Sequence, residues 1–133
     1  MGVGDGDTVT MRAQGRTLKI RLEGIDCPEL GQDFGRRAKQ FTSDMVFAKE
    51  VSVEPRGTDA YGRTVARVFS GKKDLGLELL NRGLAWHYRR YSSDRVLAEA
   101  ERQARRARVG LWSAKDPTPP WEWRRRQRGA QDR

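Results

Sequence analysis

Hydrophobic and polar residues alternate in the first part of the chain. Within 17–24, Leu18, Ile20 and Leu22 take every second position, with charged residues between them. A period of two is typical of a strand that buries one face. A shorter run at 8–12 precedes it across a short turn. The two segments therefore predict a β-hairpin.

In the segment 34–47 the apolar residues return every three or four positions instead. That spacing places them on one face of an amphipathic helix. The residues concerned are Phe34, Ala38, Phe41 and Met45. Two further helices are expected, one capped by Asp74 and ended by Gly83, the other over 92–108. The inward positions of this last helix are expected to be Val96, Leu97, Ala100, Ala104 and Ala107.

Short strands are predicted at 51–53 and 64–69. Pro55 is expected to end the first of them, because proline lacks the N–H that a strand ladder uses. Strands that come first and are then interleaved with helices indicate an α+β domain with a small barrel. Residues 1–115 are predicted to form this domain. Residues 116–133 form a tail rich in Pro, Trp and Arg, which its prolines should keep extended.

Composition adds a strong positive charge to this picture. The chain has 133 residues, which suits one domain, and its 27 Lys+Arg against 18 Asp+Glu give a net charge of +9. Such a surplus attracts polyanions. It does not separate DNA from RNA, or a nuclease from a passive binder, and a merely solvated basic surface stays open as the plain alternative.

The chain has a single cysteine, Cys27, which excludes an intrachain disulfide and a C-x-x-C metal cluster. No apolar run approaches the roughly 20 residues of a membrane helix, so no membrane partner is expected. No signal peptide is visible, and the location stays unknown. A secreted or periplasmic protein would have lost a signal upstream of this sequence.

Three short motifs carry candidate chemistry. The first, D-G-D-T at 5–8, places two carboxylates around a glycine, which suits a hard cation, although such letters commonly form a plain turn. The second, R-L-E-G-I-D-C-P-E at 21–29, ends on a loop constrained by proline. Its carboxylates could be a metal ligand and a base, or ordinary loop polar groups. The third, Y-G-R at 61–63, offers a guanidinium and a ring to a phosphate, or is a surface loop.

In this order and spacing, the three motifs resemble those of the staphylococcal-nuclease-like (thermonuclease) family. The resemblance continues through N-R-G-L-A at 81–85 and G-L-W at 110–112. It implies an OB-fold five-stranded β-barrel with three helices. The family's long first strand precedes the D-G-D-T turn, whereas only residues 1–4 precede it here. This truncated strand should leave an open sheet edge, which would favour lost stability, strand exchange or a dimer.

The resemblance also implies an activity. Family members of this kind are calcium-dependent endonucleases that hydrolyse phosphodiester bonds of DNA, RNA or both with low sequence specificity and leave 3′-phosphate ends. One Ca²⁺ would be held by the carboxylates of Asp7 and Asp26 and by the backbone carbonyl of Cys27, with Asp5 just outside the ligands. A thiol is a soft ligand, so a carbonyl role for Cys27 suits calcium. No obligate protein partner is implied.

The remaining site residues are matched in the same way. Arg21 and Arg63 match the family's two phosphate-binding arginines, and Glu29 matches the glutamate that activates or orients the attacking water. Tyr61 matches a tyrosine beside the bound nucleotide. Two more tyrosines fall where the family places further nucleotide-side tyrosines, with core packing as the alternative; they are Tyr88 and Tyr91.

A second function remains open, that of an OB-fold module that binds nucleic acid without cutting it. A passive binder needs no carboxylate beside paired arginines and a metal site, and the chain retains all five of these residues. In the tail, Trp121 and Trp123 should project to one side, either folding back on the protein or stacking on bases. The three arginines that follow, 124–126, should add nonspecific attraction to phosphates.

Overall fold

The computed structural model describes residues 2–48 and 50–131. The strands are β1 (Gly2–Val3), β2 (Thr8–Ala13), β3 (Arg16–Leu22), β4 (Ile25–Asp26), β5 (Val51–Thr58), β6 (Thr64–Ser70), β7 (Lys73–Asp74) and β8 (Trp86–His87). The helices are α1 (Gly35–Ala48), α2 (Leu75–Asn81), α3 (Arg95–Ala107) and α4 (Pro120–Gln131), with a 3₁₀ turn at Gly110–Ser113. This set of elements agrees with the predicted α+β class.

One mixed sheet forms the body of the protein. Its strand order is β1-β2-β3-β6-β5, with β7 on β6, while β4 and β8 make a separate two-stranded ladder. The β3–β6 pair is parallel and the other pairs are antiparallel. The first strand is short, with Gly2 opposite Thr10 and Val3 opposite Val9. The pairings of residues 2–48 and 50–131 run as a path from β1 to β5, and closure into a barrel is not among them.

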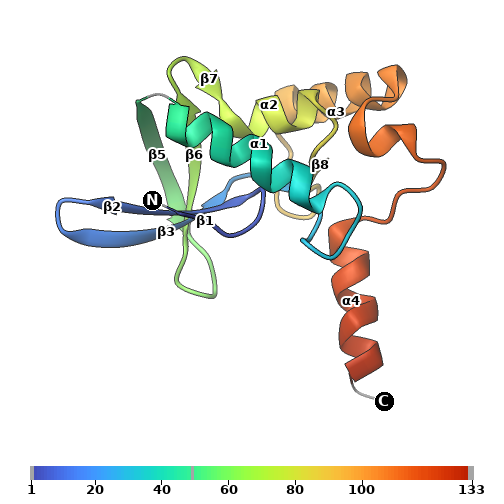
Figure 1. Ribbon diagram of the computed structural model, residues 1–133, viewed down its shortest axis with the longest axis horizontal. Coiled ribbons are helices and arrows are strands. Elements are labelled where there is room, and N and C mark those ends of the chain that lie inside the picture. The colour runs from blue at the N-terminus through green and yellow to red at the C-terminus, as the bar shows by residue number, and fades with distance from the viewer. Residues whose placement is uncertain (1, 49, 132–133) are drawn as a thin grey trace.

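The β2–β3 hairpin is present as predicted, but it buries less than the alternation suggested. Ile20 and Leu22 are buried in the core, whereas Leu18 is 37% exposed. Figure 1 shows that the hairpin extends well beyond the helices, so its outer half lies away from them. The inner half of β3, which holds Arg21, is the half that meets the core.

The prediction that Pro55 ends its strand is wrong. Strand β5 continues to Thr58, and its register against β6 shifts between Pro55 and Gly57. Proline is tolerated there because β5 is the last strand of the hydrogen-bonded path, so one side of its backbone needs no ladder partner. The loop before β6 is therefore shorter than predicted.

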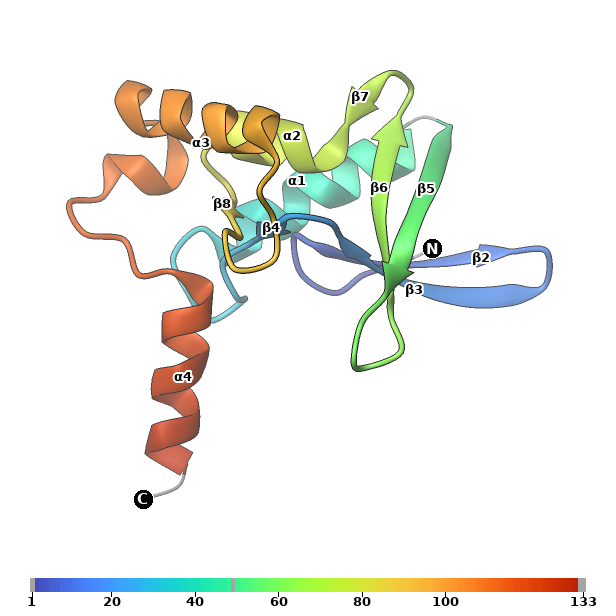
Figure 2. The same cartoon turned by 180° about the vertical axis from the view of Figure 1, so that it is seen from behind.

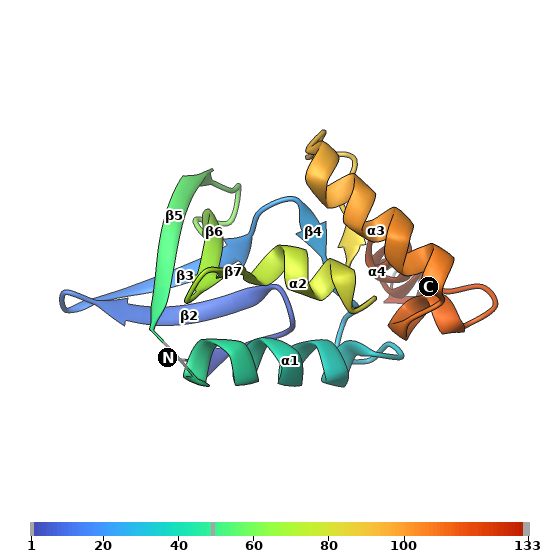
Figure 3. The same cartoon turned by 90° about the horizontal axis from the view of Figure 1, so that it is seen from above.

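Helices α1 and α2 cover the sheet, and α3 packs against α2 and β8. Figure 3 shows α1 and α2 side by side, with α3 beyond α2. Asp74 caps α2 by accepting from the Leu77 N–H, as predicted. Of the five inward positions predicted for α3, Leu97, Ala100 and Ala104 are buried. The expected burial of Val96 and Ala107 is wrong, because Val96 is 63% exposed and Ala107 is exposed as well. The buried face includes Glu101 instead, whose carboxylate accepts the His87 N–H at 2.5 Å.

The C-terminal tail is the largest departure from the sequence expectation. Residues 120–131 form the helix α4 instead of an extended tail. Pro120 takes the first helical position, where its missing N–H costs nothing, and Glu122 stands in the first turn. Figures 1 and 2 show α4 beginning beside the loop that precedes α1 and then running away from the body.

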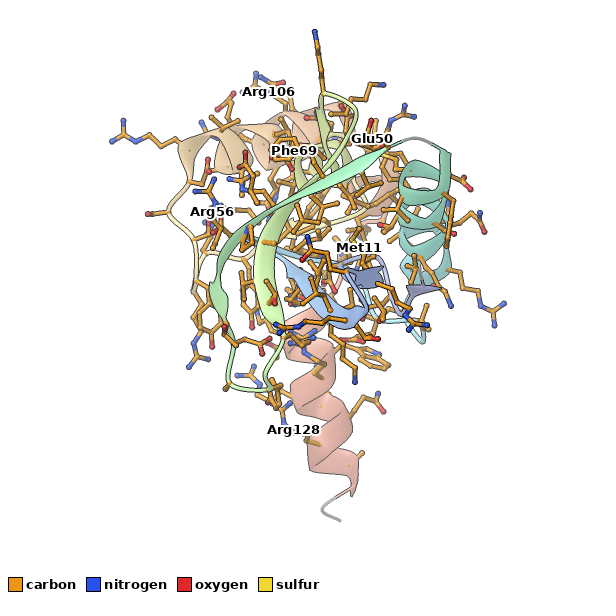
Figure 4. The ribbon with its side chains drawn as sticks, turned by 90° about the vertical axis from the view of Figure 1, so that its left-hand side faces the viewer. Met11, Glu50, Arg56, Phe69, Arg106 and Arg128 are labelled. Atoms are coloured by element: carbon orange, nitrogen blue, oxygen red, sulfur yellow. The ribbon has the colours of Figure 1, made fainter. Side chains whose placement is uncertain are left out.

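The surface is rich in charged side chains. Figure 4 shows many of them extending outward around the molecule, among them Arg106 on α3 and Arg128 on α4. Along 2–48 and 50–131, none of the helices combines the length and the apolar character that crossing a membrane requires.

Candidate active site

The D-G-D-T segment forms a tight turn that presses against α1. A Cβ on Gly6 would lie 2.7 Å from the Ala38 Cβ and 2.8 Å from the Cys27 Sγ, so only glycine fits without a shift. The Thr42 hydroxyl donates to the Gly6 carbonyl at 2.5 Å. These contacts fix the turn and direct Asp7, which is buried, toward the start of the loop after β4.

Arg21 joins the first two motifs. Its Nη1 lies 3.0 Å from Asp7 Oδ2, and its Nη2 lies 3.2 Å from Asp26 Oδ1. The backbone N–H of Cys27 also donates to Asp7 Oδ2, at 2.6 Å. Asp26 is held in the β4–β8 ladder opposite Trp86. Two buried carboxylates from distant turns thus converge on one guanidinium.

Glu29 belongs to the same cluster through a residue from the C-terminal helix. Arg124 Nη1 donates to Glu29 Oε1 at 2.7 Å and to Asp26 Oδ1 at 3.2 Å. Its Nη2 donates to Asp26 Oδ2 at 2.7 Å. The cluster therefore contains Asp7, Arg21, Asp26, Glu29 and Arg124, and we call it the carboxylate–arginine cluster.

Burial and charge perturb the groups of this cluster. Burial, together with the hydrogen bond and charge of Asp7, raises the pKa of Asp5 to about 7. Burial also raises the pKa of Asp26, against the opposing effect of Arg124 and Arg21. The pKa of Arg21 is raised, because the charges of Asp7 and Asp26 outweigh its burial. Burial thus disfavours the charged forms of Asp26 and of the adjacent Asp5, while Arg124 and Arg21 oppose this effect at Asp26.

The donor atoms of the cluster suit a hard cation. Asp7 and Asp26 provide carboxylate oxygens around one point, whereas the thiol of Cys27 is buried. Within the described ranges, no group of three or more His, Cys, Asp or Glu side chains is arranged to hold a metal ion. A cation bound here would therefore need backbone carbonyl or water ligands besides the two carboxylates.

Arg63 lies in the loop between β5 and β6, and its contacts stay within that loop. Its Nε donates to Asp59 Oδ2 at 2.7 Å, and its guanidinium lies 5.6 Å from the ring centroid of Tyr61. Tyr61 is 86% exposed. The structure therefore gathers four of the five predicted catalytic and metal-binding side chains, and it holds Arg63 on Asp59 instead.

The other two predicted tyrosines meet the C-terminal helix. The ring of Tyr88 stacks on Trp121 with centroids 5.2 Å apart, and Tyr91 meets Tyr88 edge-on at 5.0 Å. Tyr91 itself is exposed. Beside them is a cavity of about 280 Å³. It is lined by Trp86, His87, Tyr88, Arg89, Arg90, Glu101, Arg105 and Trp121.

Sequence reasoning missed the contribution of α4. It treated 124–126 as nonspecific positive charge, whereas Arg124 makes three hydrogen bonds to Asp26 and Glu29. A local signal for the helix was present, since Pro120 and Glu122 are typical of a helix start. The fold-back predicted for Trp121 is confirmed by its contacts with Tyr88 and Trp86.

Comparison with known families assigns the chain to one of them. Residues 19–114 match the family described as staphylococcal nuclease homologue. The match covers most of the chain, so the protein belongs to this family, as the motifs predicted. Helix α4 lies outside the matched residues.

Similar proteins carry related names. A protein of Haemophilus influenzae described as an uncharacterized endonuclease is 39% identical over 127 residues, which cover 95% of this chain and 71% of that protein. The micrococcal nuclease of Shigella flexneri is 38% identical over 137 residues, 95% of this chain and 79% of that protein. The staphylococcal-like nuclease CAN1 of Arabidopsis thaliana is 40% identical over 114 residues, 86% of this chain but only 35% of its own length.

Proposed function

We propose that the protein is a calcium-dependent endonuclease that hydrolyses phosphodiester bonds of DNA, RNA or both with low sequence specificity. One observation carries this proposal: a turn, two strands and a loop bring four side chains into one connected cluster, namely Asp7, Arg21, Asp26 and Glu29. A basic protein that only binds nucleic acid does not need buried carboxylates at the place where a phosphate must approach. The family membership and the names of the relatives support the same activity.

In this proposal Arg21 and Glu29 are the catalytic residues. The guanidinium of Arg21 stabilises negative charge that develops on the non-bridging oxygens as water attacks phosphorus. Glu29 lies in a half-buried position and accepts a proton from that water. The bond from phosphorus to the 5′ oxygen breaks, and this oxygen takes up a proton from solvent, so that a 3′-phosphate and a 5′-hydroxyl remain.

Asp7 and Asp26, with the carbonyl of Cys27, would hold one Ca²⁺. When bound, this ion would stabilise negative charge on the phosphate and its water. Contacts with Arg21, Arg124 and the Cys27 N–H orient these carboxylates, and a bound cation would compete with the two guanidiniums for their oxygens. We also propose that the sheet closes into an OB barrel. The parallel pairing of β3 with β6 within one sheet supports this fold.

Residues outside the cluster would contact the rest of the substrate. Arg63 would reach a phosphate by releasing Asp59, and Tyr61 is exposed enough to meet a base. Tyr91 is exposed in the same way. Tyr88 already uses one face against Trp121, which leaves its other parts for a nucleotide.

The test is a cleavage assay with single-stranded DNA and with RNA, each in calcium, magnesium or chelator. Calcium-dependent products whose 5′ ends accept phosphate from a polynucleotide kinase without prior phosphatase treatment are expected. Glu29→Gln should lower kcat by about 10²–10⁴. Glu99→Gln, on the exposed face of α3, is the matched control and should keep full activity. Binding of both polymers without cleavage, by folded protein in calcium, would leave only the nucleic-acid-binding module.

A further inference from the structure

We propose that Arg124 of α4 is a phosphate-binding residue that acts beside Arg21 on the same phosphate. The inference rests on the proposed nuclease function and extends its site to a helix outside the residues 19–114 that define the family match. It assigns a chemical role to one arginine of the C-terminal segment. The ligand is a phosphodiester of the substrate backbone.

The two guanidiniums converge on one atom. Arg21 Nη2 and Arg124 Nη1 each lie 3.2 Å from Asp26 Oδ1. The two nitrogens therefore lie within twice that distance of each other. Guanidinium groups placed so close can each donate to a different oxygen of one tetrahedral phosphate. Arg63 is bound to Asp59 in its own loop, so the guanidinium that lies beside Arg21 in this structure is that of Arg124.

The position of Arg124 is built by packing and not by charge alone. Trp121, three residues earlier and on the same face of α4, stacks on Tyr88 and meets Trp86 edge-on. Trp123 passes so close to Gly31 that a Cβ there would be 3.1 Å from its ring. The Gln32 amide donates to the Thr118 carbonyl at 3.0 Å, just before the helix. These contacts fix the start of α4 against the body of the protein and so position Arg124.

Its neighbours in the arginine triplet face elsewhere. The side chain of Arg125 is 68% exposed and pairs with Glu122, and Arg126 is 65% exposed and faces the same carboxylate. Arg124 is 31% exposed, compared with 14% for Arg21. It is therefore enclosed enough to be oriented and open enough to meet a substrate that arrives from solvent. Nonspecific attraction would not select one arginine of three in this way.

Arg124 also determines where Glu29 points. Its Nη1 donates to Glu29 Oε1 at 2.7 Å, while the Glu29 backbone N–H donates to the Gln32 side chain at 3.0 Å. An incoming phosphate would compete with these carboxylates for the guanidinium. Binding of the phosphate beside Glu29 would then place the ester next to the proposed base.

The experiment compares Arg124→Ala, Arg124→Lys and the control Arg125→Ala in the full chain. Two properties are measured: the affinity for a fluorescent phosphorothioate-linked single-stranded oligonucleotide in chelator, and steady-state DNA cleavage (kcat and KM) over a calcium titration that also gives the affinity for calcium. Arg124→Ala should weaken metal-free binding by about tenfold, the loss of one charge-assisted contact, and lower kcat at least as much. Arg124→Lys should lie between, because an ammonium cannot donate in a fork. Arg125→Ala should change binding less than about twofold, since its side chain stays in solvent.

Two outcomes would overturn the proposal. Equal effects of Arg124→Ala and Arg125→Ala on both properties would mean that Arg124 only adds charge. Faster cleavage by Arg124→Ala together with tighter calcium binding would mean that the arginine blocks the cation at Asp26. Circular dichroism checks folding, and Arg124→Lys, which keeps the charge and stem, decides the question if the alanine variant unfolds. Absence of cleavage by the parent protein would refute the nuclease function, while the metal-free binding arm would still test Arg124.

Discussion

The guanidinium of Arg21 pairs with both Asp7 and Asp26 in the carboxylate–arginine cluster. Arg21→Met tests whether these pairs stabilise the fold. Methionine keeps a long, flexible stem but removes the contacts to Asp7 and Asp26. The side chains of these carboxylates are 5% and 1% exposed, so water cannot readily replace the lost donor. The change therefore leaves buried negative charge with fewer partners.

The size of the effect follows from the partners that remain. Removing the only partner of a buried charge lowers the free energy of unfolding by about 3–5 kcal/mol. Here Asp7 keeps the Cys27 N–H at 2.6 Å, and Asp26 keeps Arg124 at 2.7 Å. We therefore expect Arg21→Met to lower the free energy of unfolding by about 2–3 kcal/mol. Lys19→Met, at an exposed position of the same strand, should change it by less than about 0.5 kcal/mol.

Denaturation by urea at pH 7 in chelator measures the difference, with equal slopes required for a two-state comparison. A divalent cation would neutralise the same carboxylates. Saturating calcium should therefore stabilise Arg21→Met more than the parent protein and narrow the gap between them. If Arg21→Met were as stable as Lys19→Met in chelator, the cluster would not depend on the guanidinium and the reasoning would fail.

Three further predictions concern the fold. Arg67→Met should lower the free energy of unfolding by about 2–3 kcal/mol in urea titrations, because Arg67 binds three carboxylates at 2.5–3.0 Å, two of which are about one-third exposed. The Leu97 and Val96 N–H groups and Arg67 outweigh burial and lower the pKa of Asp94. The pKa of Asp94 in the folded protein thus lies below its unfolded value near 3.8. At pH 7 the parent should be more stable than Asp94→Asn by about 0.5–1 kcal/mol. This difference should disappear as the pH falls from near 3.8 through the folded pKa. Gly83→Ala should lower the free energy of unfolding by about 3 kcal/mol or more, measured as a large drop in Tm on heating, because φ is +68° and the new Cβ would overlap the Val109 carbonyl oxygen.

Local patterns predicted the elements that depend on local physics. The helix over 34–47 matches α1, since apolar spacing is a property of the segment itself. The cap at Asp74 needs only neighbouring N–H groups. The predictions of burial at Val96 and of a strand end at Pro55 were wrong, because each depends on what lies across from the residue. The buried face of α3 includes Leu97, Ala100 and Ala104 but not Val96, and β5 lies at the end of the sheet path.

The candidate site likewise contains residues that local motifs predict and one residue, Arg124, that they do not. Asp7, Asp26 and Glu29 follow from motifs in short segments, and the structure places them in one cluster; their roles stay predictions. Arg124 lies 98 residues from Asp26 along the chain, so no local spacing relates the two. The proline and glutamate at the start of α4 indicate a helix, but the face that docks is selected by the tryptophan contact with Tyr88.

The enclosure of Cys27 has a practical consequence for following this helix in solution. The thiol is the sole one of the chain and is 1% exposed, packed beneath the Asp5–Asp7 turn. Maleimide dyes should not react with this thiol under native conditions. A cysteine introduced at Arg128, on the solvent side of α4, would then take a single fluorophore without replacing the native thiol. Its emission would report whether the helix stays seated while a polynucleotide is bound and released.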